Sequence, residues 1–107
     1  MSQTPFQRAI AAIDHANSDD PRQIVVGGRS LPWEIAHAEA LSGWVGRLLP
    51  EPSEAVLLAA RGQHIRRWLH PRDTFPQGRT GYLRWRTTLY RFHAAECRRI
   101  LEGEGVH

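Results

Sequence analysis

The sequence predicts an all-α fold, a compact array of about four helices in one domain that spans residues 1–107. Apolar residues recur at the three- and four-residue spacing of amphipathic helices, Pro and Gly separate these stretches, and no stretch alternates in the manner of a half-buried strand. A chain of 107 residues with 41% hydrophobic content can form one core, but it is below the size at which chains divide into two domains.

The first half of the chain predicts two helices joined by an ordered loop. Thr4 as N-cap and Pro5 at the first helical position begin a helix that should end near Asn17. Residues 18–32 carry Asp-Pro, Gly-Gly and Leu-Pro breakers around an apolar patch of three residues, which is too short for an independent strand. A second helix should run from about residue 32 to 49, with an apolar face of Trp33, His37, Ala40, Leu41, Trp44 and Leu48.

The second half predicts two further helices around a loop at residues 70–79. Ser53 is the N-cap of a third helix, whose inward face is expected to hold Leu57, Ala60, His64 and Trp68. Thr80 is the next N-cap, and the last helix should cover residues 81 to about 101. Its buried stripe is expected to be Tyr82, Trp85, Leu89, Phe92, His93, Cys97 and Ile100, which leaves Arg84, Arg91 and Arg98 outward.

The cysteine and hydropathy content narrow the class of protein. The lone Cys97 excludes an internal disulfide and a Cys-rich zinc site, and a buried reduced thiol fits a cytoplasmic setting. No apolar run approaches the ~20 residues of a membrane span, and the N-terminus lacks a basic region followed by an apolar stretch. Neither export nor membrane insertion is therefore expected.

The charge is strongly asymmetric. Ten of the fourteen arginines lie in residues 61–99, where Asp73 and Glu96 are the only carboxylates, although the net charge of the whole chain is just +3. Such a segment is typical of a face for phosphates or nucleic acid. We take an anionic small molecule as the expected ligand, and the candidate substrate-binding residues are Arg67, Arg72, Arg79, Arg86, Trp68 and Tyr82.

Part of this arginine cluster adjoins a helix terminus. Arg72 and Arg79 lie in or beside the loop before the last helix, whose N-terminal N–H groups and dipole add positive potential. The loop is therefore a candidate seat for a phosphate or carboxylate. The alternative is that the arginines are solvated or paired with the acidic first half, and that the tryptophans belong to the core.

Three histidines lie one on each of three successive helices, on the faces expected to point inward. Helix packing could bring His37, His64 and His93 together as ligands of a divalent zinc, iron or manganese ion. Glu34, Glu96 or Asp73 could complete this site, and His64 and Asp73 are the candidate catalytic residues. The alternative is three core histidines, each bonded to a carbonyl or carboxylate.

A polar group lies near the end of the first helix. Asp14, Asn17 and Asp20 fit turn chemistry before Pro21, or a salt bridge that closes onto the arginine face. The sequence contains no P-loop, no Rossmann fingerprint and no GxSxG elbow, so it gives no sign of nucleotide binding through those motifs or of serine catalysis.

Several blocks of the sequence resemble the family known as domain of unknown function 4202. The patterns AARxQHIxRWxxPR, GYxxWR and FHA fall at residues 59–72, 81–86 and 92–94, and the resemblance runs nearly end to end. Longer relatives continue with a second helical stretch, so the resemblance implies that this chain corresponds to the N-terminal part, as a short natural form or a fragment. A homodimer or a completing partner chain is then expected.

The order of the three histidines is also similar to that of the metal-dependent HD superfamily, whose helical cores hydrolyse phosphate esters or host di-iron oxidation. The sequence departs from that superfamily's adjacent His-Asp pair, because Gln63 and Ile65 flank His64, and the final aspartate would lie beyond residue 107. The departure argues against a two-metal mechanism and leaves open a mononuclear site or a relic site that binds without catalysis.

Two functions follow as hypotheses. In the first, an HD-like domain holds a divalent metal through its histidines and hydrolyses a phosphorylated or other anionic small substrate, which Arg67, Arg72 and Arg86 orient. The alternative is a non-catalytic RNA-binding or protein-assembly module, whose arginines contact phosphates and whose exposed Trp or Tyr side chains stack on unpaired bases.

Overall fold

The computed structural model describes residues 3–106 of the chain. Within this range there are four α-helices, two single-turn 3₁₀ helices and one two-stranded antiparallel hairpin. The order is α1 (Pro5–Asn17), β1 (Gln23–Val26), β2 (Arg29–Pro32), α2 (Trp33–Leu48), α3 (Glu54–Arg61), η1 (Arg67–Leu69), η2 (Arg72–Thr74) and α4 (Arg79–Gly103). The all-α prediction is therefore confirmed only as a helix-dominated fold, because the hairpin and the two 3₁₀ helices, which change the helix count, were not predicted.

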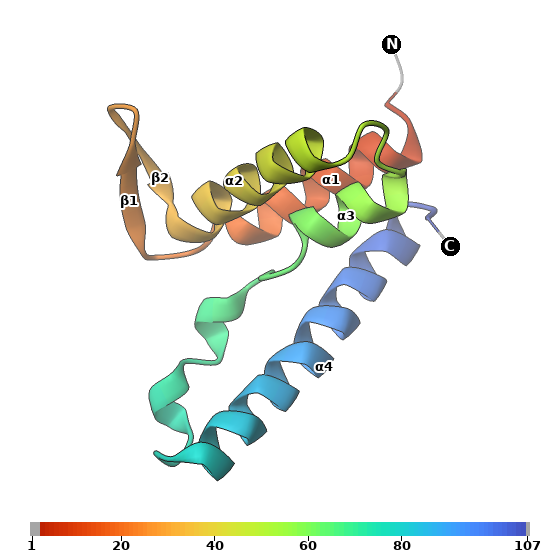
Figure 1. Ribbon diagram of the computed structural model, residues 1–107. Coiled ribbons are helices and arrows are strands. Elements are labelled where there is room, and N and C mark those ends of the chain that lie inside the picture. The colour runs from red at the N-terminus through yellow and green to blue at the C-terminus, as the bar shows by residue number, and fades with distance from the viewer. Residues whose placement is uncertain (1–2, 107) are drawn as a thin grey trace.

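The helices form one layer with a long helix crossing beside it. Helices α1, α2 and α3 lie against one another, and α4 meets α1 at the end where the chain termini also lie (Figure 1). From α3 the chain descends through η1 and η2 and returns along α4 (Figure 1). No helix within residues 3–106 is both long and apolar enough to cross a membrane.

The predicted start of α1 is confirmed. Thr4 Oγ1 accepts a hydrogen bond from the backbone N–H of Gln7 at 3.1 Å, and the Gln7 side chain accepts one from the Thr4 N–H at 2.9 Å. This reciprocal pair satisfies two backbone donors that a helix leaves without partners. Ser53 caps α3 in the same manner, since its hydroxyl accepts from the Val56 N–H at 3.2 Å.

The loop prediction for residues 18–32 was wrong, because this segment forms the β1–β2 hairpin. Gly27 and Gly28 have φ of 57° and 79°, the positive values that a tight two-residue hairpin turn requires. The Trp33 N–H donates to the Arg22 carbonyl at 2.9 Å, so the residues on either side of the hairpin are held together. The apolar patch at residues 24–26 is too short to form an independent strand, but it is stable as part of β1 because β1 pairs with β2.

The prediction that α3 includes His64 and Trp68 was also wrong, since α3 ends at Arg61. Arg66 has a left-handed backbone with φ of 51°, and its N–H donates to Oδ1 of Asn17 at 2.9 Å. A non-glycine residue adopts this conformation only when its surroundings enforce it. The turn redirects the chain, so His64 reaches the site from an irregular segment.

The apolar face predicted for α2 is largely uncovered. Glu34 and Ala38 are its buried residues, while His37 and Leu41 are half-buried. Four of the six predicted face residues are exposed, namely Trp33, Ala40, Trp44 and Leu48. Apolar periodicity identifies one face of a helix, but it does not show that a second element covers that face.

Helix α4 begins two residues earlier than predicted, with Gly78 rather than Thr80 at its N-cap. Gly81 is buried against the Pro76 carbonyl, so close that a Cβ atom would collide with it. Arg84, Arg91 and Arg98 are exposed as predicted, whereas Tyr82 is 42% exposed and does not belong to a buried stripe. The close approach at Gly81 fixes the returning loop on the start of α4.

The core is small and joins the two halves of the chain. Its buried members come from α1, α3, the segment after α3 and the end of α4, and they are Ala9, Ile13, Ala16, Leu58, Ile65 and Ile100. The radius of gyration is 14.9 Å, whereas a compact chain of this length has about 13 Å. The shape is therefore more open than a simple globule.

Candidate functional site

The three histidines lie together where α2, the segment after α3 and α4 meet. The rings of His37 and His64 are stacked, with centroids 4.0 Å apart and planes within 7°. The His93 ring is tilted by 32° to His64 at 6.0 Å, and Trp33 stacks on the other side of His37 at 5.8 Å. The predicted convergence of these side chains is present, although His64 arrives from a turn rather than a helix.

Burial keeps the histidine cluster neutral. It lowers the pKa of His64 to about 3, with added repulsion from His37 and Arg67, and lowers that of His93 to about 4. Burial also lowers the pKa of His37, against a smaller raising effect of the Gln63 side chain. At neutral pH these imidazoles are therefore uncharged.

A buried carboxylate adjoins this cluster. Glu34 is 1% exposed, and its Oε2 lies 3.7 Å from Nδ1 of His64. Its Oε1 accepts a hydrogen bond from Arg22 at 2.9 Å, while Oε2 has no hydrogen-bond partner within residues 3–106. Burial raises the pKa of Glu34 and outweighs the lowering effect of Arg22.

Asp20 and Arg22 hold this carboxylate in place. Both oxygens of Asp20 accept hydrogen bonds from the Arg22 guanidinium at 3.0 Å, and Oδ2 also accepts from the Glu34 N–H at 3.0 Å. Burial pushes the pKa of Asp20 upward, but the hydrogen bonds from Arg22 and from the Glu34 backbone leave it lowered. Asp20 thus binds Arg22 within its own turn and also holds the backbone at Glu34, the start of α2.

Arg22 and Trp33 were not predicted as site residues. The signal that could have found them was the Gly-Gly pair at residues 27–28, because a hairpin turn there places the flanking residues side by side. Residues 22 and 33 are such flanking positions, and the Arg22 guanidinium lies 5.3 Å from the centre of the Trp33 ring.

Arg67 stands between the histidine cluster and two small cavities. Its Nη1 donates to His64 Nε2 at 3.1 Å, and its guanidinium lies 5.1 Å from the centre of the Trp85 ring. One cavity, of about 190 Å³, is lined by Arg67, Arg86, His64, His93, Gln63, Leu89 and Tyr90. The other, of about 430 Å³, is lined by Arg67, Arg22, Arg72, Glu34, His70, Pro71, Trp33, Trp68 and Trp85. We call them the histidine cavity and the tryptophan cavity.

Arg86 reaches the histidine cavity from α4. Its guanidinium donates to the hydroxyl of Tyr82 at 3.3 Å and, through a short hydrogen bond, to that of Tyr90. These contacts raise the pKa of Arg86. Tyr82 therefore positions an arginine and lines neither of the two cavities among the described residues.

In the loop that was expected to bind an anion, carbonyl groups of the chain already accept the hydrogen bonds of Arg72. The Arg72 guanidinium donates to the carbonyls of Phe75, Pro76 and Gly78 at 3.2, 2.9 and 3.3 Å. Arg79 and Asp73 are exposed and line neither cavity within residues 3–106. Arg72 is thus a clamp for the loop rather than a free anion ligand.

Other acidic residues predicted near the site pair with arginines elsewhere. Asp14 accepts two hydrogen bonds from Arg61, at 2.6 and 2.9 Å, which ties α1 to α3. Glu96 lies 3.0 Å from Arg99 and 3.6 Å from Arg66. The predicted salt bridge onto the arginine segment is therefore present at Asp14, and Glu34 is the predicted carboxylate that contacts the histidines.

The histidine cluster in its present arrangement does not fit a metal ion. Buried Nε2 atoms of His37 and His93 have no hydrogen-bond partner within residues 3–106, which is favourable for a metal site. However, the lone pairs of stacked rings lie in parallel planes, so His37 and His64 cannot both direct them at one ion. No three His, Cys, Asp or Glu side chains in the described part of the chain form a group that could hold a metal.

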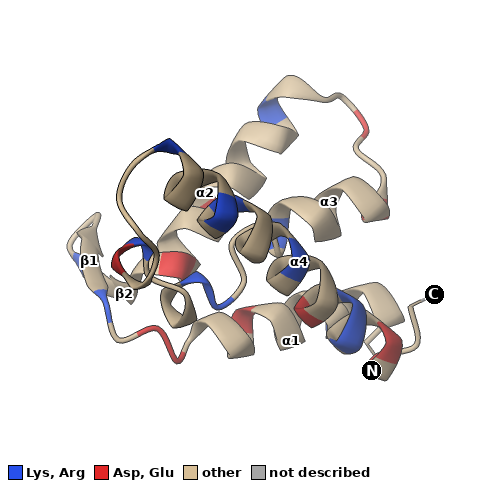
Figure 2. Cartoon of the chain, turned by 90° about the horizontal axis from the view of Figure 1, so that it is seen from below, with Lys and Arg blue, Asp and Glu red and all other residues tan. Residues whose placement is uncertain are grey.

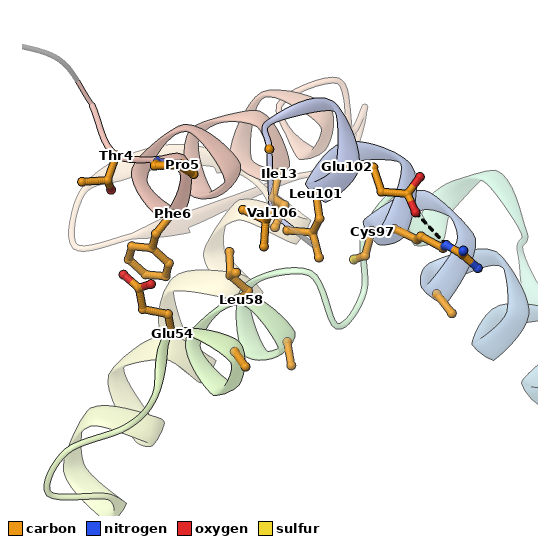
Figure 3. A pocket seen from close by; sticks show the side chains of 15 residues that line it. Thr4, Pro5, Phe6, Ile13, Glu54, Leu58, Cys97, Leu101, Glu102 and Val106 are labelled. Atoms are coloured by element: carbon orange, nitrogen blue, oxygen red, sulfur yellow. Dashed lines mark hydrogen bonds and ion pairs between the residues drawn. The ribbon is translucent and has the colours of Figure 1, made fainter.

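A cavity larger than these two lies away from the histidines. It is an apolar groove of about 1120 Å³ between α1, α3 and the end of α4, with Phe6, Leu58, Leu101 and Val106 among its lining residues (Figure 3). Cys97 faces this groove, and burial raises the pKa of its thiol to about 11. The expected homodimer or completing chain stays a prediction; this groove offers it apolar surface rather than an anion site.

Most basic residues lie in the second half of the chain. Blue segments recur along α4, whereas acidic residues occupy the turn between α1 and the hairpin (Figure 2). Of the five half-buried arginines in residues 3–106, Arg61, Arg66 and Arg72 bond to carboxylates or carbonyls. Arg67 and Arg86 bond to neither in the described range, and they share the histidine cavity.

Comparison with known proteins gave one finding. No curated protein and no solved structure matched the chain. A family model described as "Domain of unknown function (DUF4202)" matches residues 7–107, which is nearly all of the sequence. The chain therefore belongs to the DUF4202 family.

Proposed function

We propose that the chain binds a phosphorylated or other anionic small molecule in the histidine cavity, and that the neutral histidines there accept a proton during its hydrolysis. The observation that carries this proposal is the pair Arg67 and Arg86, two guanidinium groups facing one small cavity without a carboxylate partner among the described residues. A bound anion would supply the missing negative charge.

The neighbouring groups support a hydrolytic role. Neutral His64 and His93 line the same cavity in the unprotonated form that a general base needs, and a bound anion that offsets the charge of Arg67 would raise their low pKa values toward a more effective range. The Glu34 carboxylate beside His64 would stabilise the imidazolium that forms. This placement resembles an HD-like site in its histidines, but no step here passes through a metal.

Anion binding is tested by calorimetric titration with inorganic phosphate at pH 7.5. We expect Arg86→Gln to weaken binding by about 10- to 100-fold, since a hydrogen bond to a charged group contributes roughly 1.5–3 kcal/mol. Arg84→Gln is the matched control, because Arg84 is exposed on the same helix and lines a different surface. Equal affinity of Arg86→Gln and the unmodified chain would contradict the proposal.

Hydrolysis needs a separate measurement. The rate of p-nitrophenyl phosphate cleavage should fall in His64→Gln, whereas phosphate affinity should change little because both arginines remain. His15→Gln is the control, since His15 is exposed on α1. Binding without turnover in the unmodified chain would retain the anion site and discard the catalytic role.

A divalent zinc, iron or manganese ion remains the second candidate component. The unpartnered buried nitrogens of His37 and His93 favour it, and the stacking of His37 on His64 opposes it. Elemental analysis of the purified protein decides between them: one metal per chain that is lost in His64→Ala supports the ion, and no metal in the unmodified chain removes it.

RNA binding is favoured by a different surface. Arg84 and Arg91 are exposed on α4 and flank a shallow hollow of about 380 Å³ that is also lined by Thr80, Leu83, Thr87 and Thr88. Arginines that contact phosphates would give an affinity that falls steeply with salt. Titration with single-stranded RNA at two salt concentrations tests this, with the double variant of Arg84 and Arg91 to Gln expected to lose binding.

A further inference from the structure

The tryptophan cavity is unusual because its indoles are not part of the core. Trp33 comes from the start of α2, Trp68 from η1 and Trp85 from α4, and all three line this hollow of about 430 Å³. Trp33 is 37% exposed, and Trp68 and Trp85 are half-buried. Three large apolar rings therefore surround a space that the chain itself does not fill.

Guanidinium groups border these rings. Arg22 lies 5.3 Å from the centre of the Trp33 ring, and Arg67 lies 5.1 Å from that of Trp85. Arg22 is already bound by Asp20 and Glu34, and Arg72 is bound by loop carbonyls. Arg67 is thus the arginine of this cavity whose donors meet no oxygen acceptor among residues 3–106.

Arg67 also connects the tryptophan cavity to the proposed anion site. The same side chain lines both cavities, so a molecule whose anionic group lies near Arg67 has the indoles as its next neighbours. Flat rings gain most from such neighbours, because aromatic side chains stack face to face or edge to face with them. An aliphatic group of equal size would gain only apolar burial.

We propose that the tryptophan cavity is a subsite for a planar aromatic group, and that the ligand is an aromatic phosphate or carboxylate. This inference rests on the proposed anion site and names the class of molecule that it takes. The ring would lie among Trp33, Trp68 and Trp85, and the anionic group would lie toward Arg67 and Arg86.

Two phosphate esters separate planarity from size. Phenyl phosphate and cyclohexyl phosphate have rings of six carbons and the same anionic group, but only the phenyl ring is flat. We expect calorimetry on the full chain to give phenyl phosphate an affinity about fivefold higher, because only the flat ring stacks on the indoles in addition to being buried. Equal affinities for the two esters would overturn the proposal.

Variants locate the preference. Trp68→Leu and, separately, Trp33→Leu should abolish the preference for phenyl phosphate and leave the affinity for cyclohexyl phosphate nearly unchanged. Trp44→Leu is the control, since Trp44 is 56% exposed on α2 and lines neither cavity among the described residues. A preference that survives in both cavity variants, each shown to be folded by circular dichroism, would place the ring elsewhere and overturn the subsite.

Inorganic phosphate separates this inference from the function on which it rests. If phosphate binds in an Arg86-dependent manner but the phenyl ester shows no advantage, the anion site stands and the aromatic subsite fails. If neither phosphate nor either ester binds, the anion site and the subsite both fail.

Discussion

Two arginines at the site differ in their partners, because carboxylates bind Arg22 but not Arg67. Arg22 bonds to both buried carboxylates, Asp20 and Glu34, at 2.9–3.0 Å, and its single positive charge offsets one of their two negative charges. Arg67 then faces the histidines with no carboxylate of its own among the described residues. A buried ion group of this kind is costly to break, because the remaining charge loses its partner in a region of low dielectric constant.

The neutral histidines make stability depend on pH. The folded-state pKa values of His64 and His93 lie below the ordinary value of 6.5. At pH 8 these histidines therefore leave the free energy of unfolding unchanged. As the pH falls, they lower it increasingly, down to about pH 4 for His93 and about pH 3 for His64. Each such histidine lowers the free energy of unfolding by about 1.4 kcal/mol per pH unit in this window. The raised pKa of Glu34 acts in the opposite direction.

Urea unfolding at pH 7.0 and 5.0 measures this effect. His64→Gln should reduce the loss of stability between the two pH values by about 2 kcal/mol, because the unfolded variant has one proton fewer to take up. His15→Gln, at an exposed position, should leave the loss unchanged. An identical loss in His64→Gln and the unmodified chain would show that His64 titrates normally.

Cys97 should be a slow nucleophile. Its thiol has a pKa raised to about 11 by burial, compared with an ordinary value of 9.0. At pH 8 the thiolate fraction is therefore about a hundredfold lower than that of an exposed cysteine. The rate of reaction with Ellman's reagent should be reduced in the folded chain and rise to the ordinary value in urea; equal rates in the two states would contradict the burial of this thiol.

At the scale of helices and strands, the sequence predicted best those boundaries that residues nearby in the chain determine. The Thr4-Pro5 and Ser53 caps act through hydrogen bonds to residues three positions away, so local sequence is sufficient to identify them. Helix α3 ends at Arg61 with Gly62 at its C-cap, a local signal that was not recognised, and the turn that follows is held by a bond from the Arg66 N–H to Asn17, 49 positions away. No local pattern contains that distant bond.

The long helix depends on a glycine at its first turn. Gly81→Ala would place a Cβ atom against the Pro76 carbonyl, so we expect the free energy of unfolding to fall by about 1–3 kcal/mol, the cost typical of an overpacked site. Thermal unfolding followed by circular dichroism measures the change.

Gly43→Ala is the matched control for this substitution. Gly43 lies within α2 with no described atom within 4 Å of the added Cβ, so the change should stabilise the chain by about 0.5–1 kcal/mol. If the two alanine variants behaved alike, the close approach at Gly81 would not be a determinant of the fold.

Over the whole molecule, one small core connects α1 and α3 to the end of α4. Ile65 is 0% exposed at the centre of this core, directly beside His64. Ile65→Ala should lower the free energy of unfolding by about 2–5 kcal/mol, since it leaves a cavity. Val25→Ala, at a 70% exposed position on the hairpin, should change it by less than about 0.5 kcal/mol in the same urea titration. A loss below 1 kcal/mol at Ile65 would mean that the core does not close around it.

For the site, too, the sequence predicted the features that depend on local spacing and missed those that depend on distant contacts. Helical spacing predicted that His37, His64 and His93 would form one cluster, although His64 reaches it from the turn after α3 rather than from a helix. The sequence did not reveal that Arg72 is consumed by loop carbonyls, or that a hairpin brings Arg22 and Trp33 to the same place. Both facts depend on tertiary contacts that spacing within one helix does not encode.

The position of Arg67 between the histidines and both cavities links proton uptake to ligand binding. Its positive charge is one of the causes that hold the pKa of His64 low, and a bound anion would offset that charge. Because such coupling is reciprocal, an anion favours protonation of His64 to the same extent that protonation favours the anion. At about pH 4, closer to the pKa of His64, the heat of sulfate binding should then change with the ionisation enthalpy of the buffer, and this change should be smaller in His64→Gln.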